Sequence, residues 1–363
     1  MRIALFCSSR NIIPPRKTGG TEQPVFYLAK GLAEKGHRVT LYAAKGSKVP
    51  GVKIKEISPF AFGSKDYFDS RDFAASFYDL AALADFFKKD AKNFDIVQFN
   101  SFVFYEILPF VGFSKVPVPI IIRINHSSHR FIYPYIKNRL KKFKNVHYLP
   151  ISNFIKTCMP GLPYLKPIYP AIDLDDFKFS KKPDDYLLFI GRLCPKKGAH
   201  LAIKAARKAR KPLIIAGGID EQLPYPYFKN FIFPYIDNKN IIYAGEVDYK
   251  TKIKLYRGAL ATLFPIQEDE AFGNVQIESM ACGTPVVAFD RAACREAIKD
   301  GESGFIVKDG DVNQMAAAVK KISGLDRMKV RKWAEGNFSL PEMVKKYEEM
   351  YKLVIGKNKI KEK

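Results

Sequence analysis

Residues 264–287 read FPIQEDEAFGNVQIESMACGTPVV and hold two glutamates, Glu270 and Glu278, with seven residues between them. The apolar run at 261–265 predicts the end of a buried strand, and residues 275–282 predict a short helix with Gly283 at its C-cap. Glu270 then lies on the loop before the helix and Glu278 on the helix. Free N–H groups at a helix start favour an oxyanion, and carboxylates accept hydrogen bonds from hydroxyl groups. The stretch therefore predicts a site for an anionic, polyhydroxylated ligand.

Strand-like apolar runs alternate with helical stretches along the chain, which is typical of doubly wound α/β units. The runs are 3–7, 39–43, 96–99, 119–124 and 146–151, then 186–190, 213–216, 241–243, 261–265, 285–289 and 304–307. A proline-rich connection at 159–170 separates the two groups and is expected to be extended. We therefore expect one domain at 1–170, a second at 171–340, and an amphipathic helix at 341–357.

Composition indicates a globular protein with anionic partners. The 363 residues carry a formal net charge of +23, and 47% are apolar. Such charge fits nucleotide phosphates, nucleic acid or an anionic membrane face, but no zinc finger, RNA-recognition signature or long basic arm favours nucleic acid. Five scattered cysteines predict reduced thiols rather than a disulfide framework or zinc site. Without a signal peptide or a transmembrane-length run, the expected location is the cytoplasm.

Basic and glycine-rich loops follow the first strand of each half. Arg192 and Lys197 come after the strand at 186–190, where strand ends of such sheets face a ligand crevice, and two fixed cations can neutralise a leaving diphosphate without metal. Lys196 is interpreted as an ordinary surface lysine. Gly19 and Gly20 precede the first helix, so they either let a phosphate approach its N-terminus or only form a turn.

One histidine and one acidic cluster are weaker candidates. His126 stands just past a buried strand, where catalytic groups collect, although an isolated histidine is more often structural. The remaining histidines have no metal-ligand spacing with it. The acidic run 268–270 offers carboxylates to a divalent cation, but no second acidic cluster lies nearby in sequence. No metal and no cofactor are therefore expected.

These motifs together resemble the family 4 retaining glycosyltransferases of GT-B fold. The resemblance covers 1–351 and rests on Gly19-Gly20, Gly36-His37-x-Val39, Asp95-Ile96-Val97, His126, Tyr169-Pro170-x-Ile172-Asp173, Gly191-Arg192, Lys197-Gly198, and Glu270-x7-Glu278 with the Gly-Thr-Pro-Val-Val continuation. It implies two Rossmann-like domains facing a cleft. The second domain would bind a nucleotide sugar, the first would bind the acceptor, and the C-terminal helix would cross back onto the first.

The resemblance also assigns roles to single residues. Arg192 and Lys197 would hold the diphosphate, and Glu278 the ribose hydroxyls. The remaining donor contacts would come from Glu270, the backbone of Phe272, Gly273, Asn274 and Val275, the base-pocket residue Val247, and the glycines Gly19 and Gly20. His126 would sit near the reacting face of the sugar. Asn274 departs from the aliphatic residue of many members, which bears on donor preference, and 290–296 lacks their usual glycine, which bears on the backbone contacts there.

The expected reaction is transfer of a hexosyl unit from a UDP- or GDP-sugar to a hydroxyl acceptor that is lipid-linked or a small molecule. Its transition state resembles an oxocarbenium ion with negative charge growing on the diphosphate, which fixed cations and a helix dipole stabilise. Retention of configuration follows from the resemblance alone.

Other functions use the same features. A GT-B phosphorylase or a sugar-nucleotide epimerase would use the same cleft, a nucleic-acid-binding protein would use the charge without the glutamates, and a silent scaffold would keep only the fold. The segment Ile136–Lys144 forms an apolar stripe with basic neighbours, which either packs on the first domain or rests on anionic lipid at the cytoplasmic face.

Overall fold

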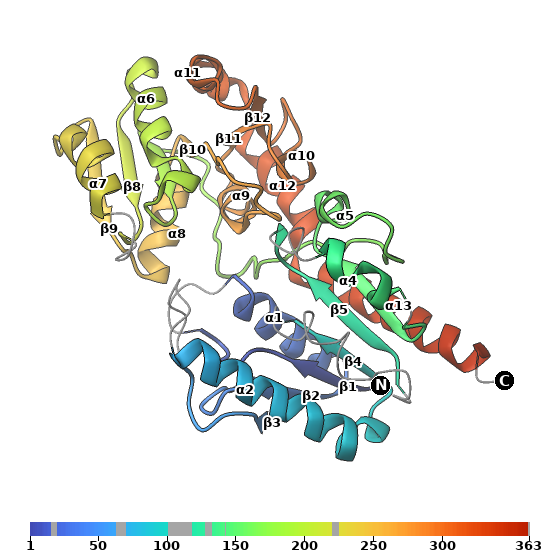
Figure 1. Ribbon diagram of the computed structural model, residues 1–363. Coiled ribbons are helices and arrows are strands. Elements are labelled where there is room, and N and C mark those ends of the chain that lie inside the picture. The colour runs from blue at the N-terminus through green and yellow to red at the C-terminus, as the bar shows by residue number, and fades with distance from the viewer. Residues whose placement is uncertain are drawn as a thin grey trace. The chain divides into compact units, whose positions relative to one another are not determined.

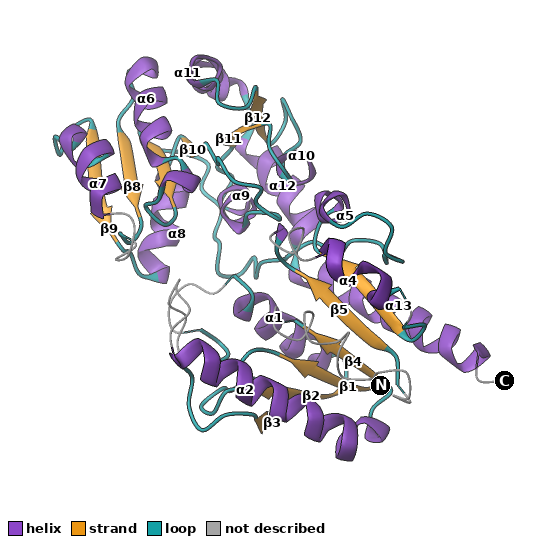
Figure 2. Ribbon diagram, in the orientation of Figure 1, coloured by secondary structure: helices purple, strands orange, loops and turns teal. Residues whose placement is uncertain are grey.

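The computed structural model describes residues 1–15, 20–62, 70–100, 118–127, 133–141, 143–219 and 225–361. The chain divides into two compact units: unit 1 contains Met1–Ala171 and Leu340–Lys363, and unit 2 contains Ile172–Ser339. Both termini therefore belong to unit 1 (Figure 1). Each unit is an α/β layer structure with its own parallel sheet between helices (Figure 2).

The sheet of unit 1 has the strand order β3-β2-β1-β4-β5-β6, and its described pairings are parallel. The strands are β1 (Arg2–Phe6), β2 (Arg38–Ala43), β3 (Lys53–Glu56), β4 (Ile96–Phe99), β5 (Ile120–Ile124) and β6 (Val146–Pro150). Five of them coincide with the apolar runs of the sequence, while β3 was not expected. Strand β3 lies at the sheet edge, reads Lys-Ile-Lys-Glu and is largely exposed. It therefore lacks the apolar run from which the other strands were predicted.

The helices of unit 1 cover both faces of its sheet. They are α1 (Glu22–Glu34), α2 (Ser70–Asp85), a π-helical turn η1 (Phe86–Asp90), a 3-10 turn η2 (Ala91–Asn93), α4 (Tyr133–Leu140), α5 (Asn153–Cys158) and α13 (Leu340–Lys361). Side chains of α1 and α13 form one core with alternate residues of β1, such as Ile3 and Leu5. Phe6, the next residue after Leu5, stacks on Tyr42 and meets Phe86 of η1 on the other face.

Helix α13 is joined to unit 1 by buried polar groups as well as by apolar packing. The Tyr351 hydroxyl donates to Gln98 Oε1 on β4 at 2.8 Å, and Gln98 Nε2 donates to Asn100 Oδ1 at 2.7 Å. Asn100 Nδ2 in turn donates to the carbonyl of Phe6. Because Tyr351, Gln98 and Asn100 are fully buried, each hydrogen bond avoids the cost of an unpaired polar group. This chain of bonds fixes the helix against the carboxyl end of β4.

The sheet of unit 2 has the order β12-β11-β10-β7-β8-β9, again with parallel pairings. Its strands are β7 (Leu187–Ile190), β8 (Leu213–Ala216), β9 (Ile241–Gly245), β10 (Ala261–Phe264), β11 (Val286–Phe289) and β12 (Gly304–Val307). All six coincide with runs expected from the sequence. The two sheets confirm the predicted fold class of two doubly wound α/β units.

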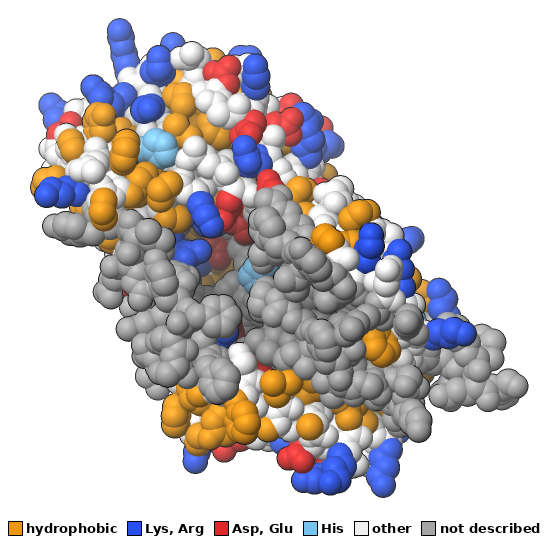
Figure 3. All heavy atoms as spheres, in the orientation of Figure 1, with side chains coloured by type: hydrophobic (Ala, Val, Ile, Leu, Met, Phe, Trp, Pro, Cys, Tyr) orange, Lys and Arg blue, Asp and Glu red, His pale blue; other side chains and the backbone are white. Residues whose placement is uncertain are grey.

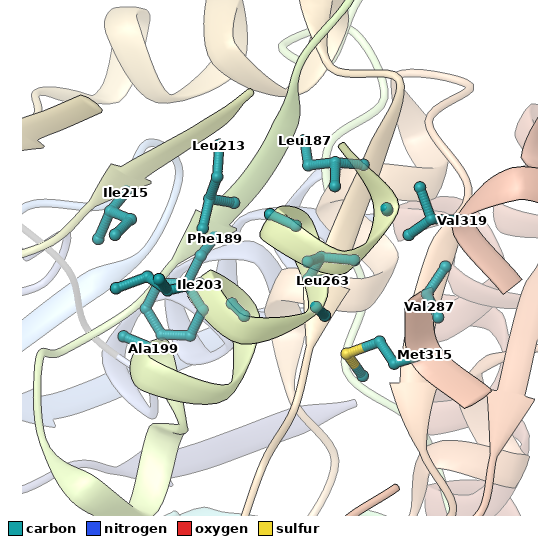
Figure 4. Close-up of a cluster of buried hydrophobic side chains, with 14 of the residues drawn as sticks. Leu187, Phe189, Ala199, Ile203, Leu213, Ile215, Leu263, Val287, Met315 and Val319 are labelled. Carbon is teal, nitrogen blue, oxygen red and sulfur yellow. The ribbon is translucent and has the colours of Figure 1, made fainter. Parts of the chain in front are cut away.

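The helices of unit 2 also lie on both faces of its sheet. They are a 3-10 turn η6 (Pro195–Lys197), α6 (Ala199–Ala209), α7 (Tyr225–Phe231), η7 (Phe233–Tyr235), α8 (Tyr249–Gly258), α9 (Asn274–Ala281), α10 (Cys294–Ala297), α11 (Val312–Lys321), η8 (Ile322–Gly324) and α12 (Arg327–Phe338). Phe189, Leu263 and Val287 point from neighbouring strands toward α6 and α11 (Figure 4). Helix α9 contacts β10 and β11, and Ser279 donates to Thr262 Oγ1 at 2.8 Å.

None of the helices in the described ranges combines the length and the apolar content that a membrane crossing requires.

Candidate active site

The candidate site lies at the carboxyl ends of β7 and β10. These two strands are neighbours, yet β7 continues in the chain to β8 on its other side, so the strand order reverses between them. In open α/β sheets ligands bind outside the carboxyl ends of the strands at such a switch point. The loop after β7 carries Arg192 and Lys197, and the loop after β10 carries Glu270. The topology therefore brings three predicted residues to one edge of the sheet.

The two loops are joined directly through their backbones. Gly198 has a φ of 78°, and a Cβ there would lie 2.1 Å from the carbonyl oxygen of Pro265, so any other residue would push the loops apart. The Gln267 N–H donates to the Lys196 carbonyl at 2.8 Å, and the Gln267 side chain donates to the Pro195 carbonyl at 2.6 Å. These contacts set the distance between the basic loop and the acidic loop.

Lys197 is the cation at the centre of the site. Its ammonium lies 2.6 Å from Glu268 Oε1 and also donates to Glu270 Oε2. Burial alone would lower the pKa of Lys197, but the nearby carboxylates of Glu270 and Glu268 outweigh it and raise that pKa above its usual value. The side chain is therefore charged at neutral pH and remains accessible to a ligand, with 19% of its surface exposed. Lys196 makes only a longer contact, with its ammonium 4.0 Å from Glu268 Oε2, and 73% of its side chain is exposed.

The third acid of the loop has a different cation. Asp269 lies 3.7 Å from the guanidinium of Arg291, which also makes a 2.5 Å contact to Asp309. The carboxylates of the run 268–270 thus pair with three cations, Lys196, Lys197 and Arg291, instead of converging on one point. Within the described ranges, no three His, Cys, Asp or Glu side chains are grouped as metal ligands. Metal independence remains a prediction.

Helix α9 begins directly after the acidic loop. Gly273 precedes it with φ 85°, and a Cβ there would lie 2.8 Å from Phe264 Cζ, so the tight entry into the helix requires glycine. The Phe272 side chain is buried against Phe338, with ring centroids 5.6 Å apart, so only its backbone can serve a ligand. Asn274 and Val275 form the first turn and are half-buried. The helix itself is confirmed, but its C-cap is Cys282, and the expected glycine, Gly283 with φ 81°, follows one residue later.

Glu278 is held by two residues of α8 that the sequence did not single out. Lys252 Nζ contacts Glu278 Oε1 at 2.8 Å, and the Tyr256 hydroxyl donates to Oε2 at 2.9 Å. Burial, reinforced by the Glu278 charge, raises the pKa of Tyr256 well above its usual range, so the hydroxyl keeps its proton. Each carboxylate oxygen has one such partner and can still accept from a ligand hydroxyl. Lys252 and Tyr256 stand four residues apart and therefore share one face of α8. This spacing is the sequence signal that could have paired them.

The other predicted residues are placed as follows. Arg192 is exposed directly after β7, and half-buried Val247 lies between β9 and α8, so both share the carboxyl edge with Glu270. Gly20 and His126 are exposed residues of unit 1, Gly20 just before α1 and His126 just after β5. Gly19 lies outside the described residues. In the Ile136–Lys144 segment, several side chains and residue 142 also lie outside them, so its apolar stripe stays a prediction.

Two family models match parts of the chain that overlap by three residues. The model described as Glycosyl transferases group 1 matches residues 172–336, and that described as Glycosyltransferase Family 4 matches residues 18–174. The chain belongs to the family 4 glycosyltransferases. The first model spans the switch point and both glutamates, and the second spans most of the first sheet.

A D-inositol 3-phosphate glycosyltransferase of Acidothermus cellulolyticus is 31% identical over 147 residues. This alignment covers 38% of the chain and 33% of the relative, so the chain matches only a third of that protein's length.

Solved structures match over nearly the full length of this family 4 chain. The sucrose-phosphate synthase of Thermosynechococcus elongatus has a TM-score of 0.78 at 17% identity, with 98% of this chain and 99% of the other covered. HepE of Anabaena, in complex with UDP and glucose, has a TM-score of 0.73 at 18% identity, covering 96% and 99%. These likenesses confirm the GT-B fold.

Proposed function

We propose that the protein is a retaining, metal-independent glycosyltransferase that moves a hexosyl unit from a nucleotide-diphosphate sugar to a hydroxyl acceptor. The observation that carries this proposal is the meeting of Lys197 with Glu270 at the switch point of the second sheet. A cation beside a carboxylate suits a ligand that has an anionic group next to hydroxyl groups. A sugar joined to a diphosphate has both.

The cations of the β7 loop serve the diphosphate. Lys197 turns from its glutamate partners toward the phosphate oxygens, and Arg192 adds a planar fork on the same loop. The N–H groups at the start of α9 point toward the same edge, because the helix begins at Asn274, four residues after Glu270. Cleavage of the glycosidic bond leaves negative charge on the diphosphate, which these preorganised donors stabilise.

The glutamates serve the hydroxyl groups. Glu278 accepts from the ribose while Lys252 and Tyr256 hold its carboxylate in place. Glu270 accepts from the sugar that is transferred. In unit 1, Gly20 and His126 are the candidate ligand contacts. A UDP-sugar is the first donor to test, because a HepE structure of this fold holds UDP and glucose.

The donor is identified by thermal shift with UDP, GDP, ADP and their sugars, since a ligand of the folded state raises its stability. The acceptor panel includes inositol phosphates, given the name of the inositol relative. With a donor and acceptor in hand, Lys197→Ala is compared with Lys196→Ala. We expect kcat to fall by a factor of about 10² or more for Lys197→Ala, and to stay near the parent value for Lys196→Ala.

The two lysines form a matched pair, since they are adjacent, carry the same charge and differ in exposure and in contact with Glu270. Because Lys197→Ala leaves Glu270 without this cation and Glu268 with only the 4.0 Å contact to Lys196, Glu268→Gln is combined with it to relieve the repulsion between the two carboxylates. An unchanged kcat in Lys197→Ala would remove this residue from the mechanism. Turnover with inorganic phosphate as acceptor, or epimerisation of the donor without any acceptor, would replace the proposal with a phosphorylase or an epimerase.

A further inference from the structure

Unit 2 carries exposed aromatic rings on the side of its sheet opposite the candidate site. Phe231 at the end of α7 is 53% exposed, and Phe233 and Tyr235 of η7 are 62% and 39% exposed. This segment leads to the amino end of β9, whereas the candidate site lies at carboxyl ends. Figure 3 shows hydrophobic side chains gathered over α7, with Lys and Arg side chains beside them. We use the name α7 patch for Phe231, Phe233 and Tyr235 together with the cations around them. These cations are Lys204, Arg207, Lys208, Arg210, Lys211, Lys229 and Lys239.

The exposed rings stand on a buried aromatic base. Phe231 lies 5.8 Å from the ring of buried Tyr227, and Phe233 lies 6.1 Å from the ring of buried Phe228. Tyr227 is itself fixed, because its hydroxyl lies 2.7 Å from His200 Nδ1 on α6. The outer rings therefore project from a packed layer, and ordering them for binding costs little side-chain entropy.

Cations surround the rings and line a recess beside them. Arg207, Arg210 and Lys211, from the end of α6, line a recess of about 520 Å³ together with Pro234, Tyr235, Asp237, Asn240 and Ile241. The Arg207 guanidinium lies 5.3 Å from the centre of the Tyr235 ring, which joins the cations to the aromatic surface. Lys204 and Lys208 of α6, Lys229 of α7 and Lys239 beyond η7 add further exposed positive charge.

The acidic groups of this surface are already engaged. Asp237 accepts from the N–H groups of Ile241, Asn240 and Lys239, and these donors hold its pKa well below the usual range. Asp185 pairs with Lys211 at 2.5 Å. The α7 patch thus combines clustered cations with exposed apolar rings.

We propose that the α7 patch docks the protein on an anionic lipid bilayer. Aromatic rings settle at the headgroup level of a membrane, and clustered Lys and Arg are attracted to anionic lipid phosphates. Binding to single-stranded nucleic acid would need a basic groove that follows the strand, whereas the cations here converge on one recess. Docking through this edge leaves the carboxyl ends of β7 and β10 free for ligands. The inference does not depend on the proposed reaction, because its test measures no turnover.

The first experiment measures partition of the whole protein onto vesicles of phosphatidylcholine with and without phosphatidylglycerol, at low and at physiological salt. We expect binding only with the anionic lipid. Phe231→Ser with Phe233→Ser should lower the partition coefficient by about tenfold. Arg207→Gln with Lys211→Gln should lower the partition coefficient by about fivefold or more for each cation removed. The double substitution should also make binding to the vesicles less dependent on salt.

Matched controls test whether the location matters. Lys320→Gln with Lys321→Gln removes the same charge from the exposed last turn of α11, and Phe77→Ser removes a ring that is 61% exposed on α2. Both controls should bind like the parent. Equal losses in the controls and in the patch variants would overturn the proposal, and so would parental binding in the patch variants. Circular dichroism of every variant identifies any that fails to fold.

A second measurement reports how deeply the α7 patch enters the bilayer and which class of partner it binds. Trp333 is the only tryptophan of the chain, so Phe233→Trp in a Trp333→Phe background places a single indole in the α7 patch. Brominated phosphatidylglycerol vesicles should quench its emission, and they should not quench an indole introduced by Phe77→Trp in the same background. Tighter binding to single-stranded RNA than to the vesicles, lost in the same variants, would assign the patch to nucleic acid and refute lipid docking. Self-association through the patch in sedimentation, without lipid binding, would refute it as well.

Discussion

The packing of α13 on α1 makes Gly31→Ala a sharp test of the fold of unit 1. A Cβ at Gly31 would lie 2.4 Å from Val344 Cγ2 on α13, well inside the ~3.5–4.0 Å at which carbon atoms pack. Helix propensity alone favours alanine over glycine by about 0.5–1 kcal/mol, but forcing an extra methyl into a packed core costs about 1–3 kcal/mol. We expect the free energy of unfolding to fall by about 1–2 kcal/mol.

The measurement is urea unfolding followed by far-UV circular dichroism, with Gly356→Ala as the control. Gly356 is also helical, and a Cβ there meets nothing within 4 Å, so this substitution should raise stability by about 0.5–1 kcal/mol. Val344→Ala removes the obstructing methyls, and with Gly31→Ala the two losses should be less than additive by about 1 kcal/mol. If Gly31→Ala were as stable as the parent, the close approach of the two helices would be wrong.

Two further substitutions test buried polar groups, each by its effect on stability. Burial raises the pKa of Asp79 to about 6, above the ~3.9 of an unfolded chain, so the folded state binds more protons and stability falls as pH rises from about 4 to 6. Asp79→Asn should remove this fall of about 3 kcal/mol in the free energy of unfolding. Urea titrations between about pH 4 and 6 in which the variant loses stability with pH as steeply as the parent would contradict this expectation. Arg327 donates to the carbonyls of Ser180 and Ala259 and to Thr284 Oγ1, so Arg327→Lys, which lacks the planar fork, should cost about 2–4 kcal/mol. Trp333 fluorescence in urea measures this loss, and a parental midpoint would show that these bonds contribute little.

The sequence predicted most of the sheet because parallel strands buried on both faces read as apolar runs. All six strands of unit 2 and five of unit 1 were found in this way. Strand β3 was not predicted, because edge strands are partly solvated and this one carries Lys53, Lys55 and Glu56. Helix α9 was placed within one residue at each end, since Gly283 and Pro285 mark its C-terminus.

Side-chain partners were harder to predict than elements. The pairing of Glu268 and Glu270 with Lys197 depends on two loops separated by about 70 residues in sequence, and only the adjacency of β7 and β10 brings them together. Lys252 and Tyr256 were missed for the same reason, because the packing of α8 against α9 follows from tertiary structure. Patterns along the chain identify which residues end strands, but not which of them touch.

The two carboxylates that contact Lys197 also determine which anions the site binds weakly. A lone phosphate or chloride ion that approached this ammonium would have to displace Glu268 and Glu270. It would leave Glu270 without this donor and Glu268 with only its 4.0 Å contact to Lys196, so it would gain little. A ligand that brings hydroxyl groups for the glutamates together with an anion for the lysine replaces every contact that it breaks. In a cell rich in small anions, such an arrangement keeps the cation available for the one class of molecule that satisfies all three side chains together.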